Sequence, residues 1–185
     1  MKKLFTLLVL PLAFMMSACS GGSDDSQQET ETTSDVRTID VYGIDQMKYV
    51  VKEEAEGLQT GETYTVNGED YFLLEGINAT TGEEMKIALT TISKIPASAM
   101  SHNWVLLDQG ADAQAFNAAS IKAKDNEYIA PDMTNMVLEN TAMAAGGETV
   151  EVEFAAPDST GDYEYLCTFP GHYAGGMKGT LTVQE

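Results

Sequence analysis

Cysteine, histidine and basic residues are scarce in this sequence. Its 185 residues include two Cys and two His, and ten Lys and Arg stand against 29 Asp and Glu, so the formal net charge is −19. Two Cys cannot build a disulfide scaffold, and so few soft ligands exclude a centre of several zinc or copper ions. Binding to nucleic acids or to anionic lipid surfaces requires a basic face on the protein, and so acidic a chain lacks one. The hydrophobic share of 43% and the charged share of 21% are nevertheless typical of a globular protein.

The N-terminus has the pattern of a bacterial export signal. Two lysines precede the apolar run Leu4–Met16, which is shorter than the roughly 18 residues of a membrane-spanning helix. The run ends in Met16-Ser17-Ala18-Cys19, which resembles a lipobox, in which small residues precede a Cys that becomes lipidated. We therefore expect residues 1–18 to be a signal peptide and Cys19 to be the lipidated first residue of the mature chain. A plain secreted protein with an incidental Cys is the alternative.

The segment after this cysteine is acidic and poor in apolar residues. Residues 20–35 contain five acids, no bases and no large apolar side chain. Such a segment cannot bury enough surface to offset its ordering entropy, which predicts that residues 19–35 form a disordered tether. The folded part is then one domain of residues 36–185.

This domain has the pattern of an all-β sandwich. Short alternating runs recur between turn residues, and Asn67-Gly68 lies between two β-prone segments, which favours a tight hairpin. The Ala-rich segment Ala111–Lys124 predicts one inserted helix. The expected strands are 37–42, 64–66, 69–72, 85–92, 104–107, 135–139, 149–154, 163–167 and 179–183.

Three soft-metal ligand types occur close together near the C-terminus. Cys167, His172 and Met177 are separated by four residues each and fall between two expected strands, so one loop carries all three. Thiolate and thioether ligands favour copper, whereas zinc is disfavoured because Met binds it poorly. His102 is the only other His in the chain and is therefore the candidate fourth ligand. Each residue type alone commonly has an ordinary packing role; their conjunction in an exported protein indicates a metal site.

Two segments of the chain carry a family resemblance. Met100–Leu106 reads MSHNWVL, and residues 167–172 read CTFPGH and are followed by MKGTLT from Met177. These segments resemble the copper-binding segments of azurin, and Gly43–Met47 resembles its first-strand region. The resemblance implies a cupredoxin, a Greek-key β-sandwich that holds one type 1 (blue) copper ion.

The resemblance also assigns roles to individual residues. His102, Cys167 and His172 would be the equatorial copper ligands and Met177 the weak axial one. The backbone carbonyl of Ser101 would take the second axial position. Asn103 would hydrogen-bond to the copper loop, and its N–H and that of Phe169 would point at the sulfur. A docking patch for redox partners would comprise Met47, Met100, Phe169, Pro170 and Ala174, with His172 as the ligand at the solvent edge; core packing is the alternative role of Met47 and Met100.

The sequence departs from azurin at several points. Four residues separate His172 from Met177 where azurin has three, Ser101 replaces a Gly, and the azurin disulfide has no counterpart. The region of residues 50–84 is also longer than in azurin, and the Asn67-Gly68 hairpin fills this excess.

The expected function is single-electron transfer by copper cycling between Cu(I) and Cu(II), without enzymatic turnover. A copper oxidase or nitrite reductase would need more His ligands than two, and a binuclear electron-transfer centre would need a second Cys in the loop. Copper storage or delivery is the alternative, which the ten Met residues mildly favour.

The lipobox-like segment and the net charge predict where the protein is located and which partners it meets. We expect a monomer, lipid-anchored at the periplasmic or outer face of a bacterial membrane, that contacts the membrane through its anchor only. Its partners would be redox proteins such as a c-type cytochrome or a terminal reductase or oxidase, and no nucleic acid. These partners would present positive surface or dock at the apolar patch, away from the acidic body.

Overall fold

The computed structural model describes residues 36–185. The expected signal peptide (1–18), the lipidation site Cys19 and the expected tether (19–35) lie outside these residues. The described residues belong to one compact unit.

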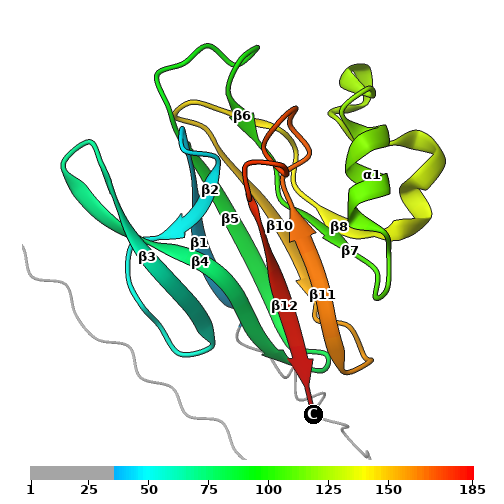
Figure 1. Ribbon diagram of the computed structural model, residues 1–185. Coiled ribbons are helices and arrows are strands. Elements are labelled where there is room, and N and C mark those ends of the chain that lie inside the picture. The colour runs from blue at the N-terminus through cyan, green and yellow to red at the C-terminus, as the bar shows by residue number, and fades with distance from the viewer. Residues whose placement is uncertain (1–35) are drawn as a thin grey trace, which may run out of the picture. The chain divides into compact units, whose positions relative to one another are not determined.

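Twelve strands make up about half of this part of the chain (Figure 1). The order in the main sheet is β10-β5-β1-β2-β4-β12-β11-β7-β8, with β3 paired to β4, and β6 and β9 pair separately. The strands are β1 (Arg37–Ile44), β2 (Lys48–Val51), β3 (Leu58–Val66), β4 (Glu69–Thr80), β5 (Glu84–Ile92), β6 (Ser101–His102), β7 (Val105–Leu107), β8 (Val137–Asn140), β9 (Ala144–Ala145), β10 (Thr149–Ala155), β11 (Gly161–Leu166) and β12 (Lys178–Gln184).

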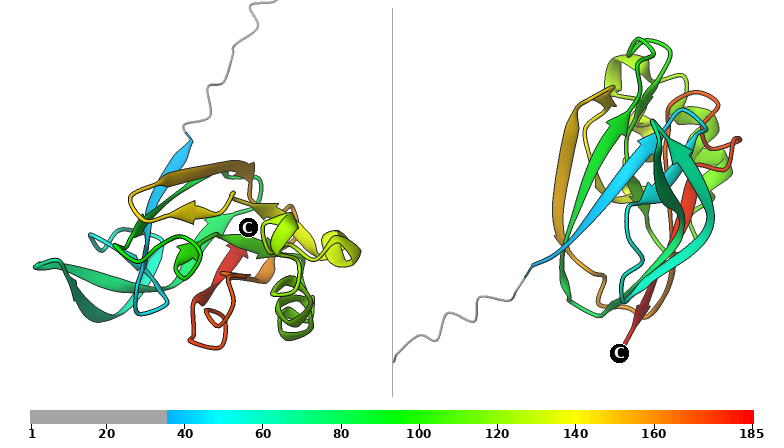
Figure 2. Two further views of the ribbon diagram at one scale, coloured as in Figure 1. Left: turned by 90° about the horizontal axis from the view of Figure 1, so that it is seen from above. Right: turned by 90° about the vertical axis from the view of Figure 1, so that its left-hand side faces the viewer.

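The main sheet folds over on itself into two layers. Figure 2 (right) shows β5 and β10 in one layer and β12 in the other. Strands β1 and β5 are parallel, as are β4 and β12, and the remaining pairs of this sheet are antiparallel. The prediction of an all-β sandwich with one short helix is confirmed. The short strands β2, β6 and β9 were not predicted, because segments of two to four residues are too brief to show a period of two.

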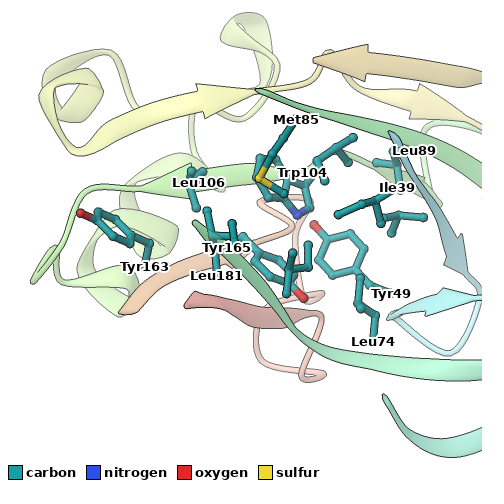
Figure 3. Packing of buried hydrophobic residues seen from close by; sticks show 14 of the residues in the cluster. Ile39, Tyr49, Leu74, Met85, Leu89, Trp104, Leu106, Tyr163, Tyr165 and Leu181 are labelled. Carbon is teal, nitrogen blue, oxygen red and sulfur yellow. The ribbon is translucent and has the colours of Figure 1, made fainter. Parts of the chain in front are cut away.

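Aromatic side chains fill the middle of the core between the layers (Figure 3). Trp104 is fully buried, with its ring 5.7 Å from that of Phe154 and 5.4 Å from that of Tyr165. The ring of Tyr49 also packs near that of Tyr165, at 5.8 Å between ring centroids. The same cluster of buried residues includes Cys167, so the loop that follows β11 starts inside the core.

The helical insertion is shorter than the sequence pattern predicted. Helix α1 (Ala113–Ser120) begins after Asp112, whose carboxylate accepts a hydrogen bond from the N–H of Ala115 at 2.9 Å. Two 3₁₀ turns follow, η1 (Lys124–Asn126) and η2 (Pro131–Met136), so the strand expected from residue 135 starts only at Val137. The chain in this region has no helix long and apolar enough to cross a membrane, and neither does any other described part.

The hairpin predicted at Asn67-Gly68 is present between β3 and β4. Both turn residues have positive φ angles, 54° and 88°, as this tight turn requires. Its strands contribute to a second, smaller cluster on the other side of β1 and β2. That cluster comprises Ile44, Val50 and Tyr71, with Tyr42, Tyr64, Val66 and Ile92 packed against it. The longer region of residues 50–84 therefore covers an outer apolar surface of the sheet.

The packing of the core predicts that two leucines on strands contribute very differently to the free energy of unfolding. Leu74 in β4 is fully buried, whereas Leu138 in β8 is 38% exposed. Replacing Leu74 with Ala should lower the free energy of unfolding by about 2–5 kcal/mol, because it leaves a cavity in the core. Leu138→Ala is the control and should change it by roughly 0.5 kcal/mol or less. Urea titration of both variants measures the difference, and equal losses would contradict the assigned burial.

Candidate metal centre

The three residues Cys167, His172 and Met177 lie on the loop 167–177 that joins β11 to β12, hereafter the copper loop. His102 is the last residue of β6, at the same end of the sandwich (Figure 1). The ligand atoms of His102, Cys167 and His172 all lie within 4.8 Å of one another, and all three residues are buried. Met177 is fully buried as well. The structure thus brings together residues that are 65 positions apart in the sequence.

The distances among these atoms suit a metal ion. Nδ1 of His172 lies 3.1 Å from Nδ1 of His102 and 3.4 Å from Sγ of Cys167, and the third separation, Sγ to His102 Nδ1, is 4.0 Å. For metal–nitrogen and metal–sulfur bonds of about 2.0 and 2.3 Å, ligand atoms in a trigonal plane lie roughly 3.5–3.8 Å apart. A trigonal His₂Cys set with a nearby Met is the donor set of blue-copper electron-transfer sites. The residues present therefore fit one copper ion.

The copper loop is folded by its own backbone. The N–H of Cys167 donates to the carbonyl of Met177 at 3.1 Å, and the N–H of Met177 donates to the carbonyl of His172 at 2.9 Å. Gly171 has a φ of 90°, which turns the chain after Pro170 and returns His172 toward the sulfur. The turn at Pro170-Gly171 is thus the feature that places His172 next to Cys167.

Asn103 connects the two ligand segments. Its Oδ1 accepts a hydrogen bond from the N–H of Thr168 at 2.9 Å, and its Nδ2 donates to Oγ1 of Thr168 at 2.8 Å. Tyr49 donates from its hydroxyl to the backbone carbonyl of Asn103. All of these groups are buried, so water does not compete for the bonds and the segments of His102 and Cys167 are held together.

Burial keeps the ligands uncharged before a metal binds. It raises the pKa of the Cys167 thiol to about 12, although hydrogen bonds from the backbone N–H groups of Asn103 and Phe169 oppose the shift by favouring the thiolate. Burial, and to a smaller extent the neighbouring His172, lowers the pKa of His102 to about 3. Burial alone lowers the pKa of His172 to about 4. Neutral imidazoles have a free lone pair for a metal at neutral pH.

Two residues for which the sequence predicts no role in the site, Tyr128 and Gly43, also shape it. The ring of Tyr128 packs edge-on against Phe169 at 5.3 Å, and the ring of Phe169 lies 4.8 Å from that of His172. Gly43 in β1 faces His102, since a Cβ atom at this position would lie 2.6 Å from Cδ2 of the imidazole. Both contacts join segments far apart in the chain, so no local pattern could have indicated them.

The predicted docking patch lies only partly at the surface. Pro170 and Ala174 are exposed and Met47 is half-buried, but Met100 is 8% exposed and Phe169 is 6% exposed. Phe169 is covered because Tyr128 packs on its ring. His172, expected at the solvent edge, is itself 2% exposed.

Ser101, whose carbonyl was expected as a weak ligand, is buried and pairs with Ala145 across β6 and β9. Its hydroxyl donates to the carbonyl of Ala97 at 2.9 Å. The side chain that replaces the expected Gly is therefore directed into a hydrogen bond of its own loop, and the role of the Ser101 carbonyl stays a prediction.

The pKa shifts predict the number of protons that copper displaces. Between about pH 5 and pH 8 both imidazoles are neutral and the thiol is protonated, so each Cu(II) bound should release about one proton, from Cys167. The apparent affinity should then rise about tenfold per pH unit. Calorimetry in two buffers of different ionisation enthalpy measures this count. A release that climbs toward three protons near pH 5 would show that the imidazoles titrate normally and would contradict the prediction.

The contact of Gly43 with His102 predicts a loss of affinity without any change of ligand. In Gly43→Ala the added methyl group meets the imidazole and should displace it, which should weaken copper binding about tenfold or more and destabilise the protein by roughly 1–3 kcal/mol. Competition titration with a copper chelator and urea unfolding measure both effects. Thr38→Ala, at an exposed position of the same strand, is the control and should leave both unchanged. A Gly43→Ala protein with unaltered copper affinity would contradict the assigned contact.

Comparison with known proteins agrees with this geometry. Residues 67–184 match the family model of copper binding proteins, plastocyanin/azurin family. The chain is 35% identical over 154 residues to azurin of Bordetella pertussis, which covers 80% of this chain and 84% of that protein. It is 48% identical over 85 residues to auracyanin-B of Chloroflexus aurantiacus, a match that spans 45% of this chain and only 36% of the relative.

Solved structures of auracyanins share the fold. Dithionite-reduced auracyanin of Roseiflexus castenholzii superposes with a TM-score of 0.59 at 26% identity, covering 80% of this chain and 97% of the other. Auracyanin A of Chloroflexus aurantiacus, described as a "blue" copper protein, gives a TM-score of 0.59 at 27% identity, with 80% and 98% covered. With the His₂Cys site in the described domain, these matches show that the chain belongs to the copper-binding plastocyanin/azurin family, that is, to the azurin-like cupredoxins.

Proposed function

We propose that this chain carries single electrons between redox partners outside the cytoplasm, through one copper ion that cycles between Cu(I) and Cu(II). The observation that carries the proposal is the buried ligand set His102, Cys167 and His172, fixed by hydrogen bonds that join its two segments. Proteins of this family are typically electron carriers.

The residues around the site contribute rigidity. Asn103 bonds to Thr168, the copper loop is closed by its own backbone bonds, and Cys167 starts within the aromatic core. When bound, copper supplies the one-electron chemistry through its bond to the thiolate. A ligand set that does not rearrange between the two oxidation states keeps the reorganisation energy low, which favours rapid electron transfer. The N–H groups of Asn103 and Phe169 stabilise negative charge on the sulfur and so tune the potential.

The burial of the site argues for transfer without turnover. His102 and Cys167 are fully buried and His172 is 2% exposed, so a substrate molecule has no access to the ligand atoms. An electron needs no such access, because it can tunnel through His172 to a redox partner docked at the nearby exposed residues Pro170 and Ala174. We therefore propose that this chain is not an enzyme.

The partners we propose are redox proteins such as a c-type cytochrome or a terminal reductase or oxidase. Pro170 and Ala174 form a small exposed apolar surface beside His172, which suits brief contacts rather than a permanent complex. The body of the protein is strongly acidic, so it would repel acidic partners elsewhere on its surface. We propose that the protein acts as a monomer.

The location we propose is the periplasmic or outer face of a bacterial membrane. The lipobox-like sequence that ends in Cys19, followed by the acidic segment 20–35, supports a lipid anchor with a flexible tether. Such a tether would let the domain reach several partners near the membrane without binding to its surface.

Copper storage or delivery is the second candidate. Ten Met residues favour it, since thioethers bind Cu(I). However, Met133 and Met136 pack against a separate buried cluster that contains Phe116 and Leu166, and Met143 packs against the main core. Their contacts are those of core-filling side chains, which leaves electron transfer better supported.

The visible spectrum of the domain tests the proposal. Residues 36–185 with one equivalent of Cu(II) should show an intense blue thiolate-to-copper band that bleaches with ascorbate and returns on reoxidation. Cys167→Ser should remain nearly colourless, because the thiolate is the source of the band. A pale wild-type complex, or one that releases copper on each reduction, would favour storage or delivery instead.

A further inference from the structure

The turn between β1 and β2 contacts the copper loop directly. Lys48, the first residue of β2, donates from Nζ to the backbone carbonyl of Gly175 at 2.7 Å, across 127 positions of sequence. Met47, just before it, packs on the same glycine, since a Cβ atom at Gly175 would lie 3.0 Å from its Cε and 3.1 Å from its Sδ. One turn thus supplies both a polar and an apolar contact to the spacer between His172 and Met177.

Side chains restrict the backbone least at the end of this spacer. Gly175 and Gly176 are adjacent and come directly before Met177, and Gly176 has a φ of 88°. Two glycines leave the backbone many conformations, so their position must be fixed by contacts. The N–H groups of Gly175 and Gly176 bond within the loop, to the carbonyls of Gly171 and Tyr173. The carbonyl of Gly175 is instead bound from outside, by Lys48.

Lys48 is itself well anchored. It pairs with Ile44 in the β1–β2 ladder, and the next residue, Tyr49, is 1% exposed within the aromatic core. Tyr49 also donates to the carbonyl of Asn103, the residue that joins the two ligand segments. The ammonium group of Lys48 therefore reaches the copper loop from a strand that is rigid relative to the metal site.

We propose that Lys48 is a positioning residue for the axial ligand. By holding the carbonyl of Gly175 it fixes the end of the spacer, and it would thereby set the approach of the Met177 thioether to a bound copper ion. The axial ligand tunes the potential of a blue-copper site, so Lys48 sets that potential through loop position. This inference rests on the proposed function, but the loop contact itself is testable without metal.

The metal-free test compares Lys48→Met with Lys52→Met. Both remove one ammonium group, but Lys52 follows β2, is exposed and pairs with Glu69 at 3.0 Å rather than with the copper loop. Loss of a charge-assisted hydrogen bond should speed amide hydrogen exchange of Gly175, Gly176 and Met177 by about tenfold or more in Lys48→Met. Exchange should be unchanged in Lys52→Met. The amide of Thr141, which donates to the carbonyl of Trp104 at 2.9 Å, should stay protected in both variants, which verifies the fold.

The copper-loaded test compares the same variants by spectrum and potential. In Lys48→Met the intensity ratio of the two thiolate-to-copper bands and the reduction potential should both change, by amounts that persist at high salt. A potential that shifts only at low salt, with an unchanged spectrum, would mean that Lys48 acts only through its charge, which overturns the proposal. Amide hydrogen exchange of the copper loop that is unchanged in Lys48→Met would also overturn the proposal. If the wild type forms no blue complex, the proposed function fails, whereas the exchange result still decides the loop contact.

Discussion

The hydrogen bonds between Asn103 and Thr168 are the interaction on which the metal site depends. They join the segment of His102 to that of Cys167, and each group they satisfy is buried. A buried polar group without a partner is costly, so the two segments must keep their relative position for the fold to be stable. The Tyr49 hydroxyl extends the network to β2, where the neighbouring Lys48 contacts the copper loop. The same hydrogen bonds therefore stabilise the fold and position the metal ligands.

The same burial determines the chemistry of the ligands. Desolvation lowers the pKa of His102 and His172 and raises that of Cys167, so all three are neutral in the absence of metal. A bound cation reverses this preference only for the thiol, which it binds as thiolate. Two backbone N–H groups already point at the sulfur, those of Asn103 and Phe169. Two donors that stabilise a thiolate are thus in place before copper binds, although desolvation keeps the free thiol protonated.

Two segments, the β3–β4 hairpin and the helical segment around α1, add to the sandwich outside the ligand positions. The β3–β4 hairpin covers an apolar cluster around Tyr71 on the outer side of the sheet, and the helical segment brings Tyr128 against Phe169. Tyr128 and the preceding Glu127 both have positive φ angles, 59° and 50°, which are uncommon for residues with a side chain. This strained turn directs the tyrosine ring over the copper loop, and it is one reason why the predicted docking patch is smaller at the surface than expected.

The sequence by itself determined the chemistry of the centre. Cys167, His172 and Met177 are close in the chain, so their spacing on one loop indicated a soft metal, and the scarcity of His left His102 as the remaining imidazole. Alternation and the Asn67-Gly68 pair likewise predicted the sandwich and its hairpin, because these signals are local. Only the tertiary structure decided which side chains are exposed and which segments meet, as with Gly43 against His102 and Lys48 against Gly175. Such contacts depend on strand register and packing across the core, which no short stretch of sequence encodes.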